Sequence, residues 1–212
     1  MLVFNTFIPQ KLSFQHPEVK VVNWPTRPCL GATRNIAITH CTGTHIVILD
    51  DDDLIRPHYL GQCAEAMAGR EWARVGGMID MQDRKIVGVS RPATNQLVFS
   101  KEAWVKAGRY PEINSGEDLG LLKGLRQKAR GGEVKTEPHQ YGYCYGWGGG
   151  TAHISAYGCD QPNKQDGLLK TQVFARKLLA ARKIRAGPVV LRPHFNADYE
   201  SEILKHFNGK AP

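Results

Sequence analysis

Short apolar segments of strand length alternate with longer segments of helical character along most of this 212-residue chain. The strand candidates are residues 2–4, 19–22, 45–49, 75–81, 85–89 and 96–99, and the helix candidates are residues 31–41, 59–68, 100–107, 115–129 and 168–185. Strands that alternate with helices predict an α/β fold, in which helices flank a sheet.

Serine and glycine mark several of the expected helix ends. Ser100 stands where an N-cap is needed, and Gly108 follows the same helix as its stop. Ser115 is placed to cap the next helix, with Asp118 three residues later, which is the spacing of a capping box. Residues 146–150 read Gly-Trp-Gly-Gly-Gly, and glycine at this density predicts a mobile loop.

Four consecutive aspartates, Asp50, Asp51, Asp52 and Asp53, follow the apolar strand candidate at residues 45–49. Ligands of open α/β sheets bind beyond the carboxyl ends of the strands. Adjacent carboxylates repel one another, so a cation among them relieves the repulsion. Asp50 and Asp52 share one side of an extended chain and can face one ion, and their oxygen atoms suit Mg²⁺ or Mn²⁺. A solvated acidic turn is the plainer alternative.

Basic residues are unevenly placed in a chain of net charge +8. Residues 164–185 hold seven lysines and arginines against the single acid Asp166, and residues 123–135 hold five against Glu133. Such a field attracts polyanions such as nucleic acid, anionic lipid or phosphorylated substrates, although a solubilising surface has the same composition. We therefore predict one domain over residues 1–165 and a basic helical extension over residues 166–212.

The remaining composition excludes several classes of protein. Five widely spaced cysteines form no CxxC pair, which gives no support to a zinc knuckle or a redox pair and indicates reduced, mostly buried thiols. No apolar run approaches the roughly 20 residues of a membrane helix, and no basic and apolar leader opens the chain. A cytoplasmic location is the expectation, and the oligomeric state stays open.

Two motifs in order resemble family 2 glycosyltransferases. The first comprises Ala32, Arg34, Asn35, Ile38, Gly43, Ile46, Leu49, Asp50, Asp52, Asp53 and Pro57. The second comprises Phe99 to Trp104, Gly108, Tyr110, Gly116, Glu117, Asp118 and Leu121, and a similar third segment covers residues 145–155. The resemblance implies the GT-A fold, a mixed sheet flanked by helices, and a glycosyltransferase that uses a nucleotide-sugar, with a UDP-sugar as the expected donor.

The resemblance also implies roles for individual residues. Asp50 and Asp52 match the DXD motif that holds manganese or magnesium and the donor diphosphate, with Asp51 and Asp53 beside them. Asp118, next to Glu117, matches the catalytic base of inverting members. Arg34 matches a position close to the donor, His153 is a candidate metal ligand, and Trp147 could close over the donor. Only about 30 residues precede residue 31, so the base-binding half is abbreviated relative to the family.

Other functions stay open at this point. A metal-dependent sugar nucleotidyltransferase shares the sheet and the acidic site, but its usual glycine-rich basic opening is missing from the first 30 residues. A degenerate domain that only binds sugars or polyanions is the non-enzymatic alternative. The basic segments favour an anionic acceptor, for example a hydroxylated or hydroxymethylated base in DNA, which would make this a DNA modification enzyme. A glycan or a lipid-linked acceptor is the rival.

Overall fold

The computed structural model describes residues 2–6, 10–12, 17–26, 28–50, 53–82, 85–146, 189–191 and 198–212. The chain divides into two compact units. The first unit comprises Met1–Cys41, Glu112–Glu117 and Ala152–Phe195, and the second comprises Thr42–Pro111, Asp118–Thr151 and Asn196–Pro212.

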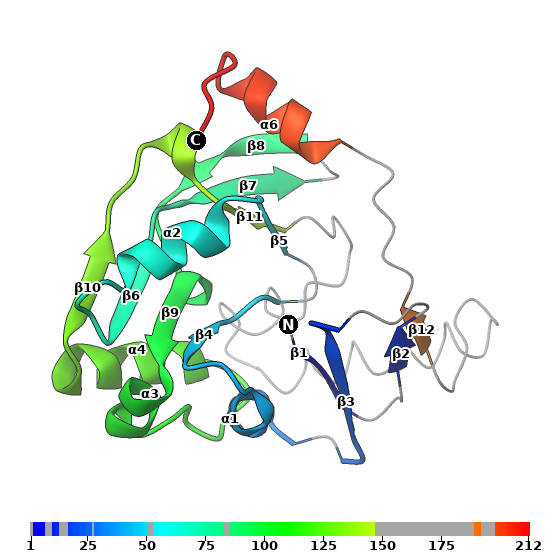
Figure 1. Cartoon of the computed structure of the whole chain (residues 1–212), viewed down its shortest axis with the longest axis vertical. Coiled ribbons are helices and arrows are strands. Elements are labelled where there is room, and N and C mark those ends of the chain that lie inside the picture. The colour runs from blue at the N-terminus through cyan, green and yellow to red at the C-terminus, as the bar shows by residue number, and fades with distance from the viewer. Residues whose placement is uncertain are drawn as a thin grey trace, which may run out of the picture. The chain divides into compact units, whose positions relative to one another are not determined.

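The described part of the first unit contains two pairs of parallel strands and one helix (Figure 1). Strand β1 (Leu2–Thr6) pairs with β3 (Lys20–Trp24), and β2 (Gln10–Leu12) pairs with β12 (Val189–Leu191). Helix α1 (Leu30–His40) follows β3 and buries Ile38. Two of its first amide groups are satisfied from residues 112–117 of the same unit, because Leu30 N donates to Asn114 Oδ1 and Gly31 N donates to Ile113 O. These bonds replace the intrahelical partners that the first turn of a helix lacks.

The second unit contains two four-stranded mixed sheets. One has the order β10-β6-β9-β4, with β4 (His45–Val47), β6 (Trp72–Val75), β9 (Leu97–Ser100) and β10 (Gly131–Val134). The other has the order β5-β11-β7-β8, with β5 (Leu54–Ile55), β7 (Met78–Gln82), β8 (Lys85–Ser90) and β11 (Tyr143–Tyr145). Both sheets combine parallel and antiparallel pairs.

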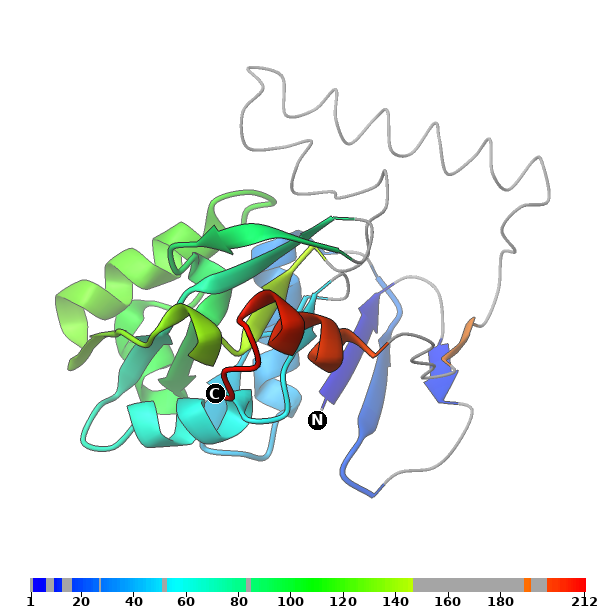
Figure 2. The ribbon, with the colours of Figure 1, turned by 90° about the horizontal axis from the view of Figure 1, so that it is seen from above.

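The described part of the second unit also contains helices, which lie beside these sheets (Figures 1 and 2). They are α2 (Tyr59–Ala66), α3 (Lys101–Ala107), α4 (Glu117–Lys128, whose first residue is assigned to the first unit), α6 (Tyr199–His206) and the short 3₁₀ helices η1 (Thr94–Gln96) and η2 (Pro138–Gln140). The predicted α/β class with a mixed sheet and flanking helices is confirmed. In the described part of the chain, none of the helices has the length and apolar character needed to cross a membrane.

Two apolar clusters form much of the core of the second unit. The larger cluster joins α2 to both sheets through Tyr59, Cys63, Ala66, Met67, Ala73, Val75, Met78, Val98 and Tyr143. The smaller cluster joins α6 to the second sheet through Ile203, Ile79, Met81 and Cys144, with Leu54 and Tyr199 packed against it. The C-terminal helix therefore completes the core of this unit.

Several expected elements differ in detail from the observed ones. Ser100 caps α3 as predicted, since its hydroxyl oxygen accepts a hydrogen bond from Ala103 N, and Gly108 ends that helix in the left-handed region at φ 97°. The strand expected at residues 75–81 is divided between β6 and β7, because Gly76 adopts φ 65° between them. The capping box expected at Ser115 is not formed: α4 begins at Glu117, directly after Gly116. The basic helix expected at residues 168–185 lies outside the described residues.

Candidate active site

The two described aspartates at the ends of the acidic run are joined by a backbone hydrogen bond. Asp50 lies beyond β4, and Asp53 lies directly before β5. Asp53 N donates to Asp50 O at 3.3 Å, so the backbones of the two described aspartates lie close together. Asp51 and Asp52 are outside the described residues, and the predicted roles of these four side chains in donor binding stay predictions.

The Asp53 carboxylate is held by donors from the protein itself. It is only 6% exposed. Tyr143 Oη donates to Oδ2 at 2.6 Å, Asn95 Nδ2 donates to the same oxygen at 3.2 Å, and Gly146 N donates to Oδ1 at 2.8 Å. A buried carboxylate is stable only when such bonds replace water. Asp53 thereby joins the end of the acidic run to β11 and to the first glycine of the predicted glycine-rich loop.

The surroundings of Tyr143 keep its hydroxyl protonated and able to donate a hydrogen bond. Its side chain is fully buried on β11. Burial, together with the negative charge of Asp53, raises the pKa of the Tyr143 hydroxyl well above its usual value. Both effects disfavour the phenolate, so the hydroxyl keeps the proton that it donates to Asp53.

Helix η1 contacts carboxylates from both sequence motifs. Thr94 Oγ1 donates to Asp118 Oδ2, and the next residue, Asn95, donates to Asp53. The fully buried Gln96 braces this helix, because its Oε1 accepts from Ala93 N at 2.6 Å and its Nε2 donates to Gly77 O at 2.5 Å. Two adjacent side chains thus bring the acidic run and the start of α4 together within the second unit.

The predicted catalytic residues Glu117 and Asp118 have different partners. Asp118 is partly buried, and its Oδ1 also accepts a hydrogen bond from Leu119 N at 2.7 Å. Within the first unit, Glu117 is 3% exposed and its Oε1 accepts a hydrogen bond from Arg34 Nη1 at 2.7 Å. The structure therefore joins two sequence-predicted site residues, Arg34 and Glu117, in one largely buried ion pair.

The described residues alone do not make up a metal centre. Among them, no group of three or more histidine, cysteine or acidic side chains is placed to hold an ion. Asp50 is the described member of the predicted Asp50–Asp52 ligand pair, and His153 and Trp147 are, like Asp52, outside the described residues. The carboxylate chemistry of the pair fits Mg²⁺ or Mn²⁺.

Three residues of this site were not identified from sequence: Thr94, Asn95 and Tyr143. The polar run Thr-Asn-Gln before strand β9 was a usable signal, because polar side chains next to a buried strand need partners. Gln96, expected as the first residue of a strand, is the last residue of η1. Tyr143 carried no such signal, since a tyrosine in an apolar strand is ordinary.

Comparison with known proteins identifies a family for about half of the chain. Residues 8–109 match the family described as glycosyl transferase family 2, which confirms the resemblance seen in the sequence. The matched segment includes the acidic run and η1. No curated protein sequence matches the chain.

Solved structures of TarS from S. aureus are among those similar to this chain. TarS 1-349 in complex with UDP has a TM-score of 0.48 and 15% identity, covering 79% of this chain and 59% of that one. TarS 1-349 in complex with UDP-GlcNAc has a TM-score of 0.47 and 15% identity, covering 90% of this chain and 55% of that one. The present chain thus spans less than two thirds of the length of these proteins.

Proposed function

We propose that this chain, whose residues 8–109 belong to glycosyl transferase family 2, transfers a sugar from a nucleotide-diphospho-sugar to a hydroxyl group. The observation that carries the proposal is η1, which hydrogen-bonds both Asp53 and Asp118. The acidic run and the candidate base come from separate sequence motifs, and the transfer reaction needs them in one place. A UDP-sugar is the proposed donor, and the family match together with the acidic run supports it.

The reaction makes two demands that these residues meet. Negative charge grows on the diphosphate as the bond to the sugar breaks, and a divalent ion on Asp50 and Asp52 would stabilise it. The acceptor hydroxyl is a weak nucleophile, so Asp118 takes its proton while the oxygen bonds to the anomeric carbon. The nucleoside diphosphate leaves with the electrons of the broken bond, and a single displacement of this kind inverts the anomeric configuration.

Other side chains support these roles. Glu117 is engaged with Arg34, so it neutralises and orients that guanidinium, while Asp118 serves as the base. Arg34 matches a family position close to the donor. Trp147 would close over the donor, and His153 would be a further ligand of the ion.

The proposed acceptor is anionic, with a hydroxylated or hydroxymethylated base in DNA as the specific candidate. The +8 net charge and the basic segment at residues 164–185 support it. DNA binding at low salt that weakens steeply as salt rises is the expected result. Absence of binding to single and double strands at low salt would redirect the proposal to a glycan or lipid-linked acceptor.

The test is an assay of nucleoside diphosphate release from a panel of nucleotide-sugars in the presence of Mn²⁺. We expect turnover by the wild type, release of nucleoside diphosphate rather than pyrophosphate, and a loss of at least about 100-fold in Asp52→Asn. Glu65→Gln, which changes an exposed carboxylate on α2, is the matched control and keeps wild-type activity. Equal turnover by Asp52→Asn and the wild type would contradict the proposed role of the acidic run.

A further inference from the structure

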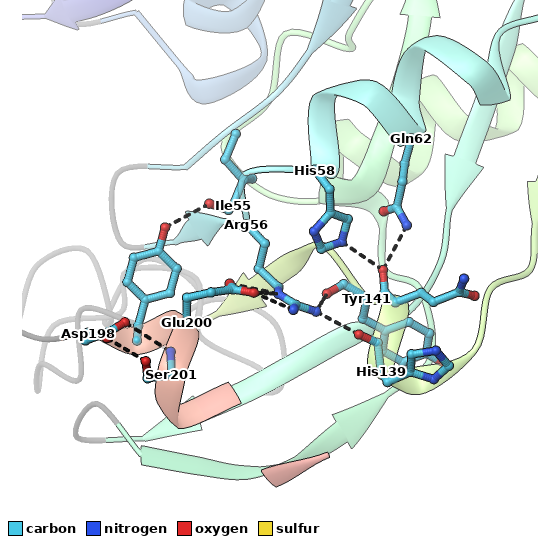
Figure 3. Close-up of polar contacts among 11 residues, drawn as sticks. Ile55, Arg56, His58, Gln62, His139, Tyr141, Asp198, Glu200 and Ser201 are labelled. Atoms are coloured by element: carbon cyan, nitrogen blue, oxygen red, sulfur yellow. Dashed lines mark hydrogen bonds and ion pairs between the residues drawn. The ribbon is translucent and has the colours of Figure 1, made fainter. Parts of the chain in front are cut away.

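The guanidinium of Arg56 is buried at the point where three segments of the second unit meet (Figure 3). Its Nη2 donates to Glu200 Oε1 at 2.6 Å, and its Nε donates to Glu200 Oε2 at 3.0 Å. Its Nη1 donates to the carbonyl oxygens of His139 at 2.8 Å and Tyr141 at 3.1 Å. One side chain therefore links the end of β5, the segment that leads into β11, and the C-terminal helix α6.

Burial of the guanidinium makes Arg56 depend on its ion pair with Glu200. The Arg56 side chain is 0% exposed and the Glu200 side chain 29% exposed. A buried guanidinium without a counter-charge is strongly unfavourable, and a two-point Arg–carboxylate bond fixes direction as well as distance. Glu200 supplies the carboxylate, so the observed place of Arg56 depends on α6.

Strand β5 is very short and is held at both ends. It consists of Leu54 and Ile55, paired antiparallel with β11. Asp53 precedes it and is bound by Tyr143, Asn95 and Gly146. Arg56 follows it, and its own backbone N donates to Gly142 O at 2.8 Å. A two-residue strand has little pairing energy of its own, so the bonds at its ends set its position.

Helix α6 also touches β5 directly. Tyr199 Oη donates to Ile55 O at 3.4 Å, and Leu54 packs against the cluster that contains the fully buried Ile203. The apolar face of α6 therefore holds the helix against the sheet. The bond from Glu200 to Arg56 fixes the position of the helix relative to the end of β5. Asp198 caps this helix by accepting a hydrogen bond from Ser201 N at 3.0 Å.

We propose that Glu200 is a positioning residue for the donor site, acting through Arg56 and β5 on Asp53 and Asp50. This inference rests on the proposed function of the acidic run. Asp53 lies three residues before Arg56, and its backbone N is bonded to Asp50 O. We therefore expect a displacement of Arg56 to move Asp53 and, through that bond, Asp50, although Glu200 lies 147 residues from Asp53 in the sequence.

The test compares Glu200→Gln with Glu202→Gln in the full-length protein. Glu200→Gln keeps the volume of the side chain but removes the charge and one acceptor. Glu202 lies on the same helix, its side chain is 60% exposed, and its partner among the described residues is Lys205, so Glu202→Gln is a matched control. Arg56→Lys is a second variant, which keeps the charge balance and removes the planar two-point geometry.

Two readouts separate positioning from simple stability. In wild-type protein with measurable turnover, we expect Glu200→Gln and Arg56→Lys to raise the donor KM by about 10-fold at a temperature well below their unfolding midpoints. Hydrogen exchange of a peptide covering residues 53–58 should accelerate by about 5-fold or more in both variants and stay unchanged in Glu202→Gln.

The outcomes are distinguishable from a failure of the proposed function. Unchanged exchange at residues 53–58 in Glu200→Gln would overturn the link between α6 and β5, whatever the enzyme does. Faster exchange with an unaltered donor KM, in an active wild type, would overturn the positioning role. A wild type without turnover or nucleotide binding would contradict the proposed function instead, and with it the inference that depends on it.

Discussion

Removal of one hydroxyl, in Tyr143→Phe, measures how firmly Asp53 is held. The ring of Tyr143 is fully buried, so phenylalanine fills nearly the same space and the main loss is the bond of 2.6 Å to Asp53 Oδ2. Hydrogen bonds to charged groups contribute about 1.5–3 kcal/mol. Asn95 and Gly146 still donate to the carboxylate, so the free energy of unfolding should fall by an amount within that range and not beyond it. For a chain of this size it corresponds to a fall of roughly 3–12 °C in Tm.

The control for this variant is Tyr59→Phe. The Tyr59 ring is also fully buried and meets the Tyr143 ring edge-on, with 5.7 Å between the ring centroids. Among the described residues its hydroxyl makes no hydrogen bond of normal geometry, and Cys63 beside it is a weak partner. Tyr59→Phe should therefore change the free energy of unfolding by less than about 1 kcal/mol. Urea unfolding of both variants measures the two changes in the free energy of unfolding. Equal decreases would refute the assignment of Asp53 as a buried, internally bonded carboxylate.

Three further results are expected. Burial lowers the pKa of His58 from its usual value of 6.5. As the pH falls, the unfolded chain therefore protonates this imidazole at a higher pH than the folded chain does. The free energy of unfolding should then rise with pH between the folded pKa and 6.5, and His58→Gln should flatten that rise in urea titrations. Gly61→Ala should stabilise α2 by about 0.5–1 kcal/mol, because no atom of the described residues outside this helix lies within 4 Å of the added methyl carbon. Gly124→Ala should destabilise α4, because its methyl carbon would meet the last carbonyl oxygen of α3. Unfolding curves of the two variants that shift in the same direction would contradict this. Burial raises the pKa of Cys144 to about 12, so iodoacetamide at pH 8 should label the partly exposed Cys29 before Cys144 in the native protein. Peptide mass spectrometry would show the order of labelling, and the reverse order would contradict this prediction.

The fold class could be predicted because its signals are local. Apolar runs, serine caps and glycine stops act over a few residues, and Ser100 and Gly108 bound α3 as expected. The family motifs could be read for the same reason. Residues 8–109 match the family, and Arg34 and Glu117, predicted separately, form an ion pair.

The hydrogen bonds that hold the site could not be predicted, because they join residues far apart in the sequence. Asp53 and Tyr143 are 90 residues apart, and Arg56 and Glu200 are 144 apart. Both Asp53 and Arg56 are charged, and charged side chains are ordinarily assigned to the surface. Only the tertiary arrangement of the second unit shows that both side chains are buried and bonded to distant segments.

The elements missed from the sequence have weak local patterns. β5 is two residues long, and β10 contains two glycines, Gly131 and Gly132, directly after the helix expected at residues 115–129. Pairing with β6 places them in the sheet, and Gly131 lies against Trp72, where a larger side chain would not fit. Tertiary contacts thus override the usual preference of glycine for turns.

The central claim is that Asp118 removes the proton of the acceptor hydroxyl in a family 2 glycosyl transfer. The most direct test is single-turnover transfer by Asp118→Asn, with donor binding measured separately by calorimetry in Mn²⁺. Asparagine can still accept the hydrogen bond from Thr94, so the fold and the donor site should persist. We predict an unchanged donor Kd and a transfer rate lower by about 100-fold or more. A transfer rate equal to that of the wild type would contradict the account.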